Sequence, residues 1–368
     1  MLAEEPAGRG WTRRAMLCCL ATLRLRAGSE GGQWFSSDRV RLLDPATDFP
    51  LLRLTSPAYS SHFSASHLRA VSRSGAFLLF SSDRTGSWQV FRLEQSSGRQ
   101  QLLTQARALD GASPALMPDD RSFCYLDGGS LHRFNLVKPR DKEIYRVPEG
   151  WKRSGGLSLS RDGSQAVLVE ARGGVFRLRL VKTSSGKATT VLERAAVLSD
   201  PVLRSRRERL LYRQETDSLW AVGLDGRQNR SLPLAPGGLG SVIWSPDGAS
   251  IFYLRRPPDG RLPAEVREHR LQGGADQLVA ATSRFQVFSA NRDASVFVGA
   301  SASRASPYVL LLLHATRREM ALCEHGASDP ARVDPVFSPD SQWVYFESDR
   351  EGKWAIYCAP VDRFVERT

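Results

Sequence analysis

The sequence has few features that would support a cysteine metal site, a membrane span or a serine hydrolase. Its 368 residues include five cysteines, and none stands in a Cys-x-x-Cys pair or at a zinc-site spacing from histidine. The apolar run at residues 309–313 is too short to cross a bilayer and predicts a strand buried on both faces. No Gly-x-Ser-x-Gly elbow occurs, which argues against an α/β-type serine hydrolase.

Lysine is also scarce, because only six of the 51 basic residues are lysines and arginine supplies most of the net charge of +12. Arginine binds carboxylates and phosphates through two parallel hydrogen bonds, so the excess is compatible with a polyanionic partner. It is equally compatible with an arginine-rich, solvated surface. No basic stripe alternates with aromatic residues and no nucleic-acid recognition module is present, so a nucleic-acid partner is not expected.

What the sequence does contain is a unit that recurs seven times, about every 44 residues, a period typical of a four-stranded propeller blade. Each unit has a small or charged residue in a tight turn, followed by an apolar strand. The turn positions are Ser74, Asp119, Asp162, Arg206, Asp247, Asp293 and Asp340. The sequence therefore predicts an all-β fold, one seven-bladed β-propeller of four-stranded blades, at residues 38–363.

The ends of the chain carry separate expectations. Residues 40–55 predict a strand pair that adds an outer strand to the last blade and so closes the ring. Residues 1–37 are interpreted as a leader and linker, and residues 364–368 as a C-terminal tail. Arg13 and Arg14 precede an apolar stretch, which resembles a twin-arginine export signal. A functional signal would place the protein in the periplasm or outside the cell; otherwise the leader is a disordered segment of a cytoplasmic protein.

Two segments, one in the first unit and one in the last, agree at five positions. Ser82, Asp83, Arg84, Gly86 and Trp88 have the same residues as the corresponding positions of the run at 348–354. Aspartate caps a turn and glycine allows positive φ, so both segments predict a loop before the third strand. We expect the tryptophan to present a large apolar face to the neighbouring blade.

Propellers bind ligands at the mouth of the central channel, on loops that enter the innermost strands, so residues five to twelve positions before each turn are the candidates. The residues expected to bind a substrate are Arg69, Arg153, Arg204, Ser241 and Gln286. The same regions contain His62, His67, Asp329, Arg332 and Asp334. Each of these can also be an ordinary rim residue.

The sequence resembles the oligogalacturonate lyases, a family of seven-bladed propeller enzymes of bacterial pectin breakdown. The matching text includes residues 44–47 with 53–55, 118–125, 146–151 and 244–248. The resemblance implies that short galacturonate chains are split by β-elimination. It also implies a divalent metal, usually manganese, held by histidines and a glutamine of the sixth and seventh blades.

At the positions that the resemblance assigns to the metal, this chain has Arg332 and Asp334 for two histidines, Asp329 for the glutamine, and Val287 beside Gln286 for the third histidine. An arginine would repel a divalent cation, although the two aspartates offer oxygen ligands.

If the chain is a carbon–oxygen lyase of acidic oligosaccharides, we expect Arg332 to neutralise the uronate carboxylate and His62 or His67 to act as the base. The alternative is a propeller that only binds such sugars, or a non-catalytic scaffold for proteins or peptides in the cell envelope.

Overall fold

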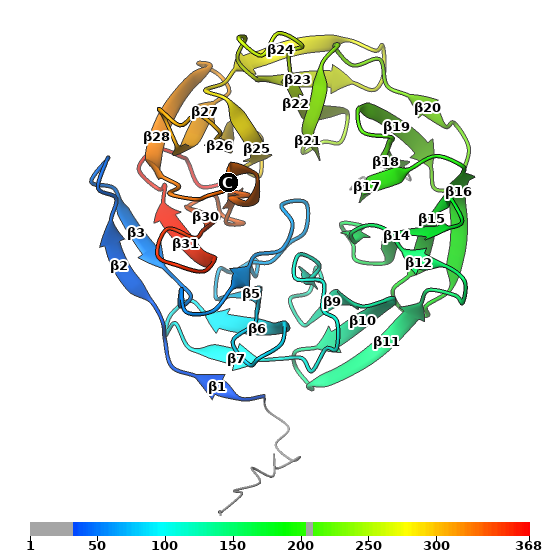
Figure 1. Cartoon of the computed structure of the whole chain (residues 1–368), viewed down its shortest axis with the longest axis horizontal. Coiled ribbons are helices and arrows are strands. Elements are labelled where there is room, and N and C mark those ends of the chain that lie inside the picture. The colour runs from blue at the N-terminus through cyan, green and yellow to red at the C-terminus, as the bar shows by residue number, and fades with distance from the viewer. Residues whose placement is uncertain (1–31, 204–208) are drawn as a thin grey trace, which may run out of the picture. The chain divides into compact units, whose positions relative to one another are not determined.

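The computed structural model describes residues 32–203 and 209–368, and regular structure in this part of the chain is almost entirely β-strand. Seven antiparallel sheets form the blades of a ring (Figure 1). The single helical element among the described residues is a 3₁₀ turn, η1 (Pro330–Arg332). The prediction of an all-β, seven-bladed propeller is therefore confirmed. The twin-arginine-like leader lies outside the described residues.

Within each blade the strands follow one another from the channel outward. Blade 1 consists of β4 (Ser61–His62), β5 (Phe77–Ser82), β6 (Gln89–Glu94), β7 (Gln100–Leu102) and β1 (Trp34–Phe35). Blade 2 consists of β8 (Ala115–Leu116), β9 (Ser122–Asp127), β10 (Ser130–Asn135) and β11 (Arg140–Arg146). Blade 3 consists of β12 (Lys152–Arg153), β13 (Ser158–Leu159), β14 (Gln165–Arg172), β15 (Val175–Lys182) and β16 (Ala188–Arg194).

The remaining blades have the same order. Blade 4 consists of β17 (Leu198–Leu203), β18 (Arg209–Gln214), β19 (Ser218–Gly223) and β20 (Arg230–Ser231). Blade 5 consists of β21 (Gly238–Trp244), β22 (Ser250–Arg256), β23 (Glu265–Arg270) and β24 (Asp276–Ala281). Blade 6 consists of β25 (Phe285–Ala290), β26 (Val296–Ser301), β27 (Tyr308–Leu313) and β28 (Arg318–Glu324). Blade 7 consists of β29 (Val336–Phe337), β30 (Trp343–Ser348), β31 (Ala355–Pro360), β3 (Pro50–Arg53) and β2 (Val40–Leu43).

The N-terminal hairpin β2–β3 closes the ring, as the sequence predicted. Strand β3 pairs with β31, with Leu52 opposite Cys358 and Arg53 opposite Tyr357. The first strand, β1, pairs instead with β7 of blade 1, so part of the segment interpreted as a linker is a strand. The N-terminal part of the described chain therefore covers the outer edges of both blades that meet at the closure, which leaves fewer unpaired strand edges.

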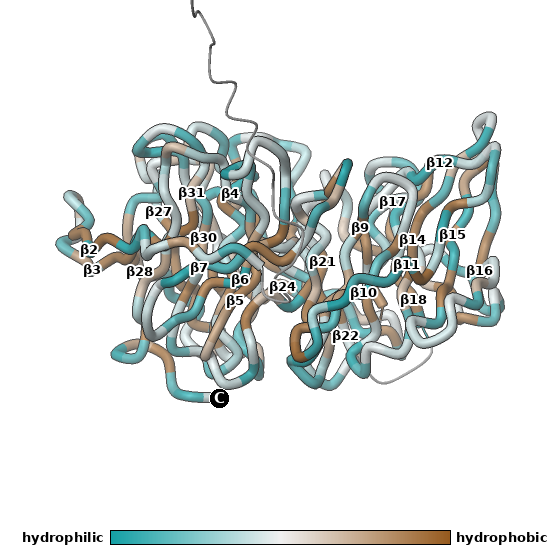
Figure 2. Tube along the Cα trace, turned by 90° about the horizontal axis from the view of Figure 1, so that it is seen from below, coloured by the Kyte–Doolittle hydropathy of each residue, from teal (hydrophilic) through white to brown (hydrophobic). Residues whose placement is uncertain are grey.

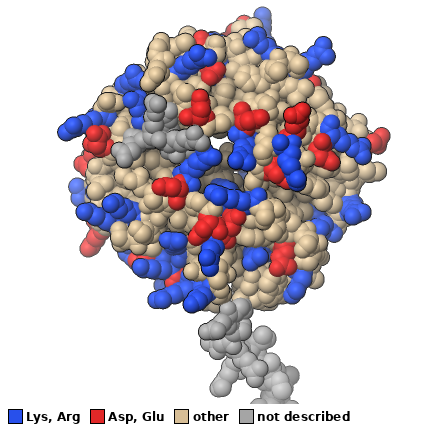
Figure 3. Space-filling view, turned by 180° about the vertical axis from the view of Figure 1, so that it is seen from behind, with Lys and Arg blue, Asp and Glu red and all other residues tan. Residues whose placement is uncertain are grey.

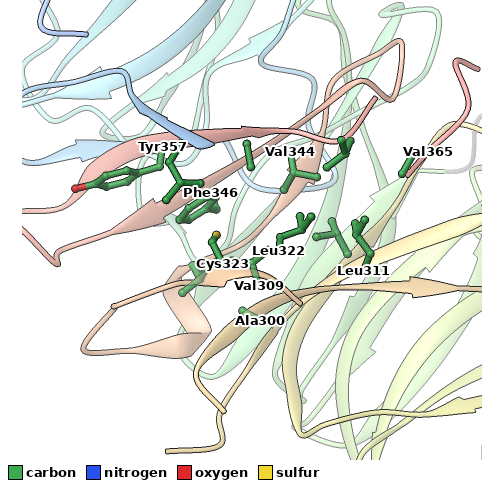
Figure 4. Packing of buried hydrophobic residues seen from close by; sticks show 14 of the residues in the cluster. Ala300, Val309, Leu311, Leu322, Cys323, Val344, Phe346, Tyr357 and Val365 are labelled. Carbon is green, nitrogen blue, oxygen red and sulfur yellow. The ribbon is translucent and has the colours of Figure 1, made fainter. Parts of the chain in front are cut away.

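Apolar side chains fill the spaces between neighbouring blades. Seen from the side, hydrophobic segments run through the middle of the blades while polar loops lie at both faces of the ring (Figure 2). Between blades 6 and 7, Val309 and Leu322 pack with Phe346 and Tyr357 (Figure 4). Val365 joins this cluster and is only 3% exposed, so the segment interpreted as a tail contributes to the core.

The two faces of the ring differ in the connections that they carry. Because first and second strands of a blade are antiparallel, the turn that joins them lies at one end of the channel, and the loop that enters the first strand lies at the other. We call these the turn face and the loop face. The loop between the second and third strands also lies on the loop face, so the segments ending at Trp88 and Trp354 are there.

Candidate functional site

One connected polar group on the loop face is built around His62, the last residue of β4. The imidazole Nδ1 lies 2.9 Å from Glu347 Oε2, and the Phe63 N–H donates to Glu347 Oε1 at 2.6 Å. Glu347 is 5% exposed in β30 of blade 7, the blade next to His62 across the closure. Since a carboxylate only accepts, Nδ1 carries a proton, and in the neutral imidazole Nε2 is then the nitrogen with the lone pair.

Arg332, at the end of η1, lies over the ring of His62. Its Nη2 is 3.0 Å from Nε2 and 3.3 Å from Nδ1. A donor along the lone pair of Nε2 would be much farther from Nδ1, so the guanidinium covers the face of the ring and leaves the lone pair open. Trp88 stacks on His62 with ring centroids 4.8 Å apart, and the Arg332 guanidinium is 4.1 Å from the centre of the Trp354 ring. We call these four side chains the Trp–His–Arg–Trp stack.

The two tryptophans of the matching segments therefore have a different role from the one expected. We predicted that each would present its face to the neighbouring blade. Trp88 instead covers a histidine of its own blade, and Trp354 covers an arginine that precedes the first strand of its own blade. Both fix functional candidates at the channel mouth, and a cation over an indole face stabilises that arrangement by about 0.5–2 kcal/mol.

The two aspartates that were considered as metal ligands have different partners. Asp329 caps η1, where its Oδ1 accepts the Ala331 N–H at 3.0 Å. Asp334 accepts the Ser66 N–H at 3.0 Å from the loop that enters the channel. Burial and the nearby charge of Glu347 raise the pKa of Asp334 to about 6.

These residues do not fit the manganese that the resemblance implies. Across residues 32–203 and 209–368, no three histidine, cysteine, aspartate or glutamate side chains are grouped as a metal site. Arg332 places a cation at the centre of the expected ligand set, and a second guanidinium, that of Arg256, donates to the Gln286 carbonyl at 3.1 Å. Cationic donors cannot ligate a divalent ion, so no step of a reaction is assigned to a metal here.

A cavity of about 360 Å³ lies in the part of the channel near the loop face. It brings together three residues selected from the sequence, His67, Ser241 and Gln286, and two arginines that were not, Arg213 and Arg256.

Arg213 forms an ion pair with Asp200 at 2.9 Å, and burial lowers the pKa of its guanidinium. Arg213 and Arg256 stand in the last two residues of second strands, β18 and β22. The ends of second strands reach the loop face as the starts of first strands do, and this signal could have identified Arg213, Arg256 and Glu347.

His67 lies inside the channel rather than at its mouth. Its Nε2 donates to the Leu157 carbonyl at 2.8 Å, and burial lowers its pKa, so it is neutral at pH 7 with Nδ1 able to accept a proton. The segment between β4 and β5 that carries it extends into the centre of the ring (Figure 1). His67 therefore separates the cavity of the loop face from a second cavity toward the turn face.

The described arginines that the sequence analysis selected as substrate-binding residues already have partners within the protein. Arg69 lies toward the turn face, where it pairs with Asp120 and donates to the Met117 carbonyl. Arg153 forms an ion pair with Asp110 at 2.7 Å and donates to the Gly128 carbonyl at 3.0 Å, so it joins blades 2 and 3. Arg204 lies outside the described residues.

Oligogalacturonate lyases are among the known proteins that this chain resembles in sequence. A sequence model described as oligogalacturonate lyase matches residues 39–176. An oligogalacturonide lyase of Pectobacterium atrosepticum is 23% identical over 367 residues, which cover 86% of this chain and 95% of that protein. An oligogalacturonate lyase of Dickeya dadantii is 22% identical with the same coverage.

Solved structures agree in fold. A structure of an oligogalacturonate lyase in complex with manganese has a TM-score of 0.85 at 22% identity and covers 90% of this chain and 98% of its own. An oligogalacturonate lyase from Vibrio parahaemolyticus has a TM-score of 0.83 at 22% identity, with the same coverage of both chains. The resemblance found in the sequence is therefore confirmed: this chain is similar in sequence to oligogalacturonate lyases and shares their seven-bladed propeller fold.

Proposed function

We propose that this propeller acts on acidic oligosaccharides of the galacturonate type at the loop face of its channel, and that it does so without a metal ion. The observation that carries the proposal is the Trp–His–Arg–Trp stack with its buried partner Glu347. It places a fixed cation beside a histidine whose tautomer is set by a carboxylate.

The roles follow from the chemistry of β-elimination. The Arg332 guanidinium pairs with the uronate carboxylate and stabilises the negative charge that develops when the neighbouring carbon loses its proton. Nε2 of His62 takes that proton, the electrons of the C–H bond form a carbon–carbon double bond, and the adjacent glycosidic C–O bond breaks. The leaving sugar oxygen takes up a proton from solvent, so each cleavage yields one unsaturated and one saturated fragment.

The divalent metal of the family would supply the same charge neutralisation as a Lewis acid. In this chain the arginine at the expected ligand position takes over that function under the proposal. The manganese-bound relative is thus a guide to the fold and not to the ligand set of this chain.

The proposal is tested by incubating the full-length protein with trigalacturonate, once with added manganese and once with excess chelator. We expect the absorbance of an unsaturated uronate to rise at equal rates in both conditions, together with a raised melting temperature from ligand binding. Turnover that requires manganese would overturn the metal-independent mechanism. A raised melting temperature without turnover would leave a sugar-binding propeller, and neither signal would favour the scaffold of the cell envelope.

The substitution Arg332→Met tests whether Arg332 binds the uronate carboxylate specifically or only adds to the positive charge of the protein. Loss of a carboxylate partner should weaken trigalacturonate binding about tenfold or more. Arg41→Gln removes an exposed arginine from the hairpin at the edge of blade 7 and should leave binding unchanged. Equal effects of both substitutions would contradict a specific role of Arg332.

A further inference from the structure

The opposite end of the channel holds a cavity that the proposed function does not use. It has a volume of about 640 Å³, within the range of small-molecule sites. Among residues 32–203 and 209–368, four arginines line it, namely Arg69, Arg73, Arg161 and Arg292, and no aspartate or glutamate does. Figure 3 shows this turn face, with basic side chains close around the central hollow and acidic ones beside them.

Three of these arginines occupy the same position in three different blades. Each of the six described turns between first and second strands has a backbone hydrogen bond from its fourth residue to its first, as from Gly163 to Ser160 at 2.8 Å. The second residue of the turn is Arg73, Arg161 or Arg292 in blades 1, 3 and 6. It is proline in blades 2, 5 and 7 (Pro118, Pro246 and Pro339).

The turn itself does not explain the arginines. Proline is favoured at the second position of such turns because its φ is already fixed near the required value. An arginine there gains nothing for the turn and projects a long cationic side chain from the rim. Its recurrence in three blades that face one cavity therefore brings three positive charges to the rim of that cavity.

The three guanidinium groups are also free to bind. Arg69 is neutralised by Asp120, but the side chains of Arg73, Arg161 and Arg292 are exposed and have no hydrogen bond or ion pair with the described residues. The neighbouring turn carboxylates are engaged elsewhere. Asp162 accepts from the Ser164 N–H and Asp293 from the Ser295 N–H, both at 3.0 Å.

We propose that the turn-face cavity is a second binding site, rimmed by Arg73, Arg161 and Arg292, for a small ligand that carries two or three oxyanion groups. Guanidinium groups bind carboxylates and phosphates with the same bidentate geometry, so the chemistry of the ligand is a multivalent carboxylate or phosphate. Two such groups on one ligand can engage arginines of different blades at once, and the second contact is then intramolecular. The site is distinct from the Trp–His–Arg–Trp stack and does not depend on the proposed function.

Calorimetry on the full-length protein at low salt tests this site with two probes, trigalacturonate and inorganic tripolyphosphate. The variant Arg73→Gln/Arg161→Gln/Arg292→Gln should bind the preferred probe at least tenfold more weakly, because three charge-assisted contacts are removed. The charge-matched control Arg41→Gln/Arg304→Gln/Arg318→Gln changes exposed arginines away from the cavity and should bind as the wild type. Trigalacturonate is titrated in an Arg332→Met background, in which its proposed contact at the loop face is removed, so the binding that remains belongs to the turn-face cavity.

A second variant guards against a folding defect. Arg161→Pro/Arg292→Pro gives two turns the residue found in blades 2, 5 and 7, so the melting temperature without ligand should not fall while binding does. Stronger binding of trigalacturonate would identify a carboxylate ligand, and stronger binding of tripolyphosphate a phosphate ligand. The proposal would be overturned by equal weakening in the triple variant and the charge-matched control. It would also be overturned if the wild type did not bind tripolyphosphate and the Arg332→Met background did not bind trigalacturonate.

Discussion

At the scale of single residues, Glu347 connects the two blades that meet at the closure. Its two carboxylate oxygens accept from the imidazole of His62 and from the backbone N–H of the next residue. One side chain of blade 7 thereby sets both the position and the tautomer of a candidate base in blade 1. Glu347 is a positioning residue, because it acts through His62 and does not face the proposed substrate.

Glu347→Gln should reduce galacturonate turnover about tenfold or more, since the amide can hold the wrong tautomer of His62 and a well-placed base contributes roughly 10²–10⁴ in rate. The affinity for trigalacturonate should change little. Nitrogen NMR of the imidazole should report the tautomer directly. Glu351→Gln is the control. The carboxylate of Glu351 pairs with Arg53 at 2.7 Å and has no contact with His62. A loss of turnover with the His62 tautomer unchanged would contradict the positioning role.

Asp334 makes stability depend on pH. Its pKa rises from 3.8 to about 6 in the folded state, because burial and the Glu347 charge disfavour the carboxylate. A raised folded pKa means that the native state binds the proton more tightly than the unfolded chain does. Its stabilising contribution is complete below about pH 3.8 and is lost as the pH rises through about 6.

Asp334→Asn should therefore be more stable than the wild type at pH 8, by about 1–3 kcal/mol, and the difference should disappear by pH 4. Asparagine tolerates the φ of 34° at this position and can still accept the Ser66 N–H. Urea unfolding at the two pH values measures the difference. A difference of equal size at both would show that the ionisation of Asp334 is not its cause.

At the scale of elements, the hairpin β2–β3 is held by Asp44 as well as by strand pairing. Asp44 is completely buried. Its carboxylate accepts from the Thr47 N–H at 3.0 Å and from the Glu324 N–H of blade 6 at 3.1 Å. Residues 44–47, which are part of the family resemblance, therefore have a structural role: they attach the closing hairpin to the blade beside it.

Asp44→Ala should lower the free energy of unfolding by about 2–4 kcal/mol, because it leaves buried backbone donors without an acceptor. The exposed Asp48, in the same hairpin loop at φ 53°, is a matched control as Asp48→Asn. Chemical denaturation of both variants measures the effect. If Asp44→Ala is as stable as the control, the hairpin is held by strand pairing alone.

Particular elements show what the sequence could predict. The turn period predicted the seven blades and the closing hairpin, because turn chemistry and strand patterning are local. It did not place Arg69 correctly: five positions before the turn, Arg69 already lies beyond β4 and near the turn face, where it pairs with Asp120.

Glu347, Arg213 and Arg256 were missed because a residue at the end of a second strand reaches the channel only through the antiparallel geometry of the blade. The convergence of His62, Trp88, Arg332 and Trp354 depends on ring closure, which brings the first and last blades together, and no local pattern shows it.

At the scale of the whole molecule, the ring joins blades that could otherwise open separately. Cys124, Cys323 and Cys358 lie in blades 2, 6 and 7, and all three are buried. Burial raises the pKa of the Cys124 and Cys358 thiols to about 12 and also raises that of Cys323. The thiolate is the reactive form, so none should react in the folded protein.

In a Cys18→Ser/Cys19→Ser variant, a thiol reagent should label no cysteine under native conditions. With increasing denaturant the three should become reactive together, because opening one blade removes the packing of its neighbours on both sides. Mass spectrometry of labelled peptides measures each site. Labelling of Cys358 well before Cys124 would instead show that the ring opens at blade 7 first.

The pairing of β3 with β31 also bears on the order of events during synthesis. The hairpin that completes blade 7 leaves the ribosome before blade 1, whereas its partner strand emerges after all six other blades. Throughout translation of the intervening 300 or so residues, β3 has an unpaired edge beside a growing arc of blades. The nascent chain therefore stays an open arc until its last strand emerges, and binding of a chaperone to that edge would delay closure without disturbing any blade already formed.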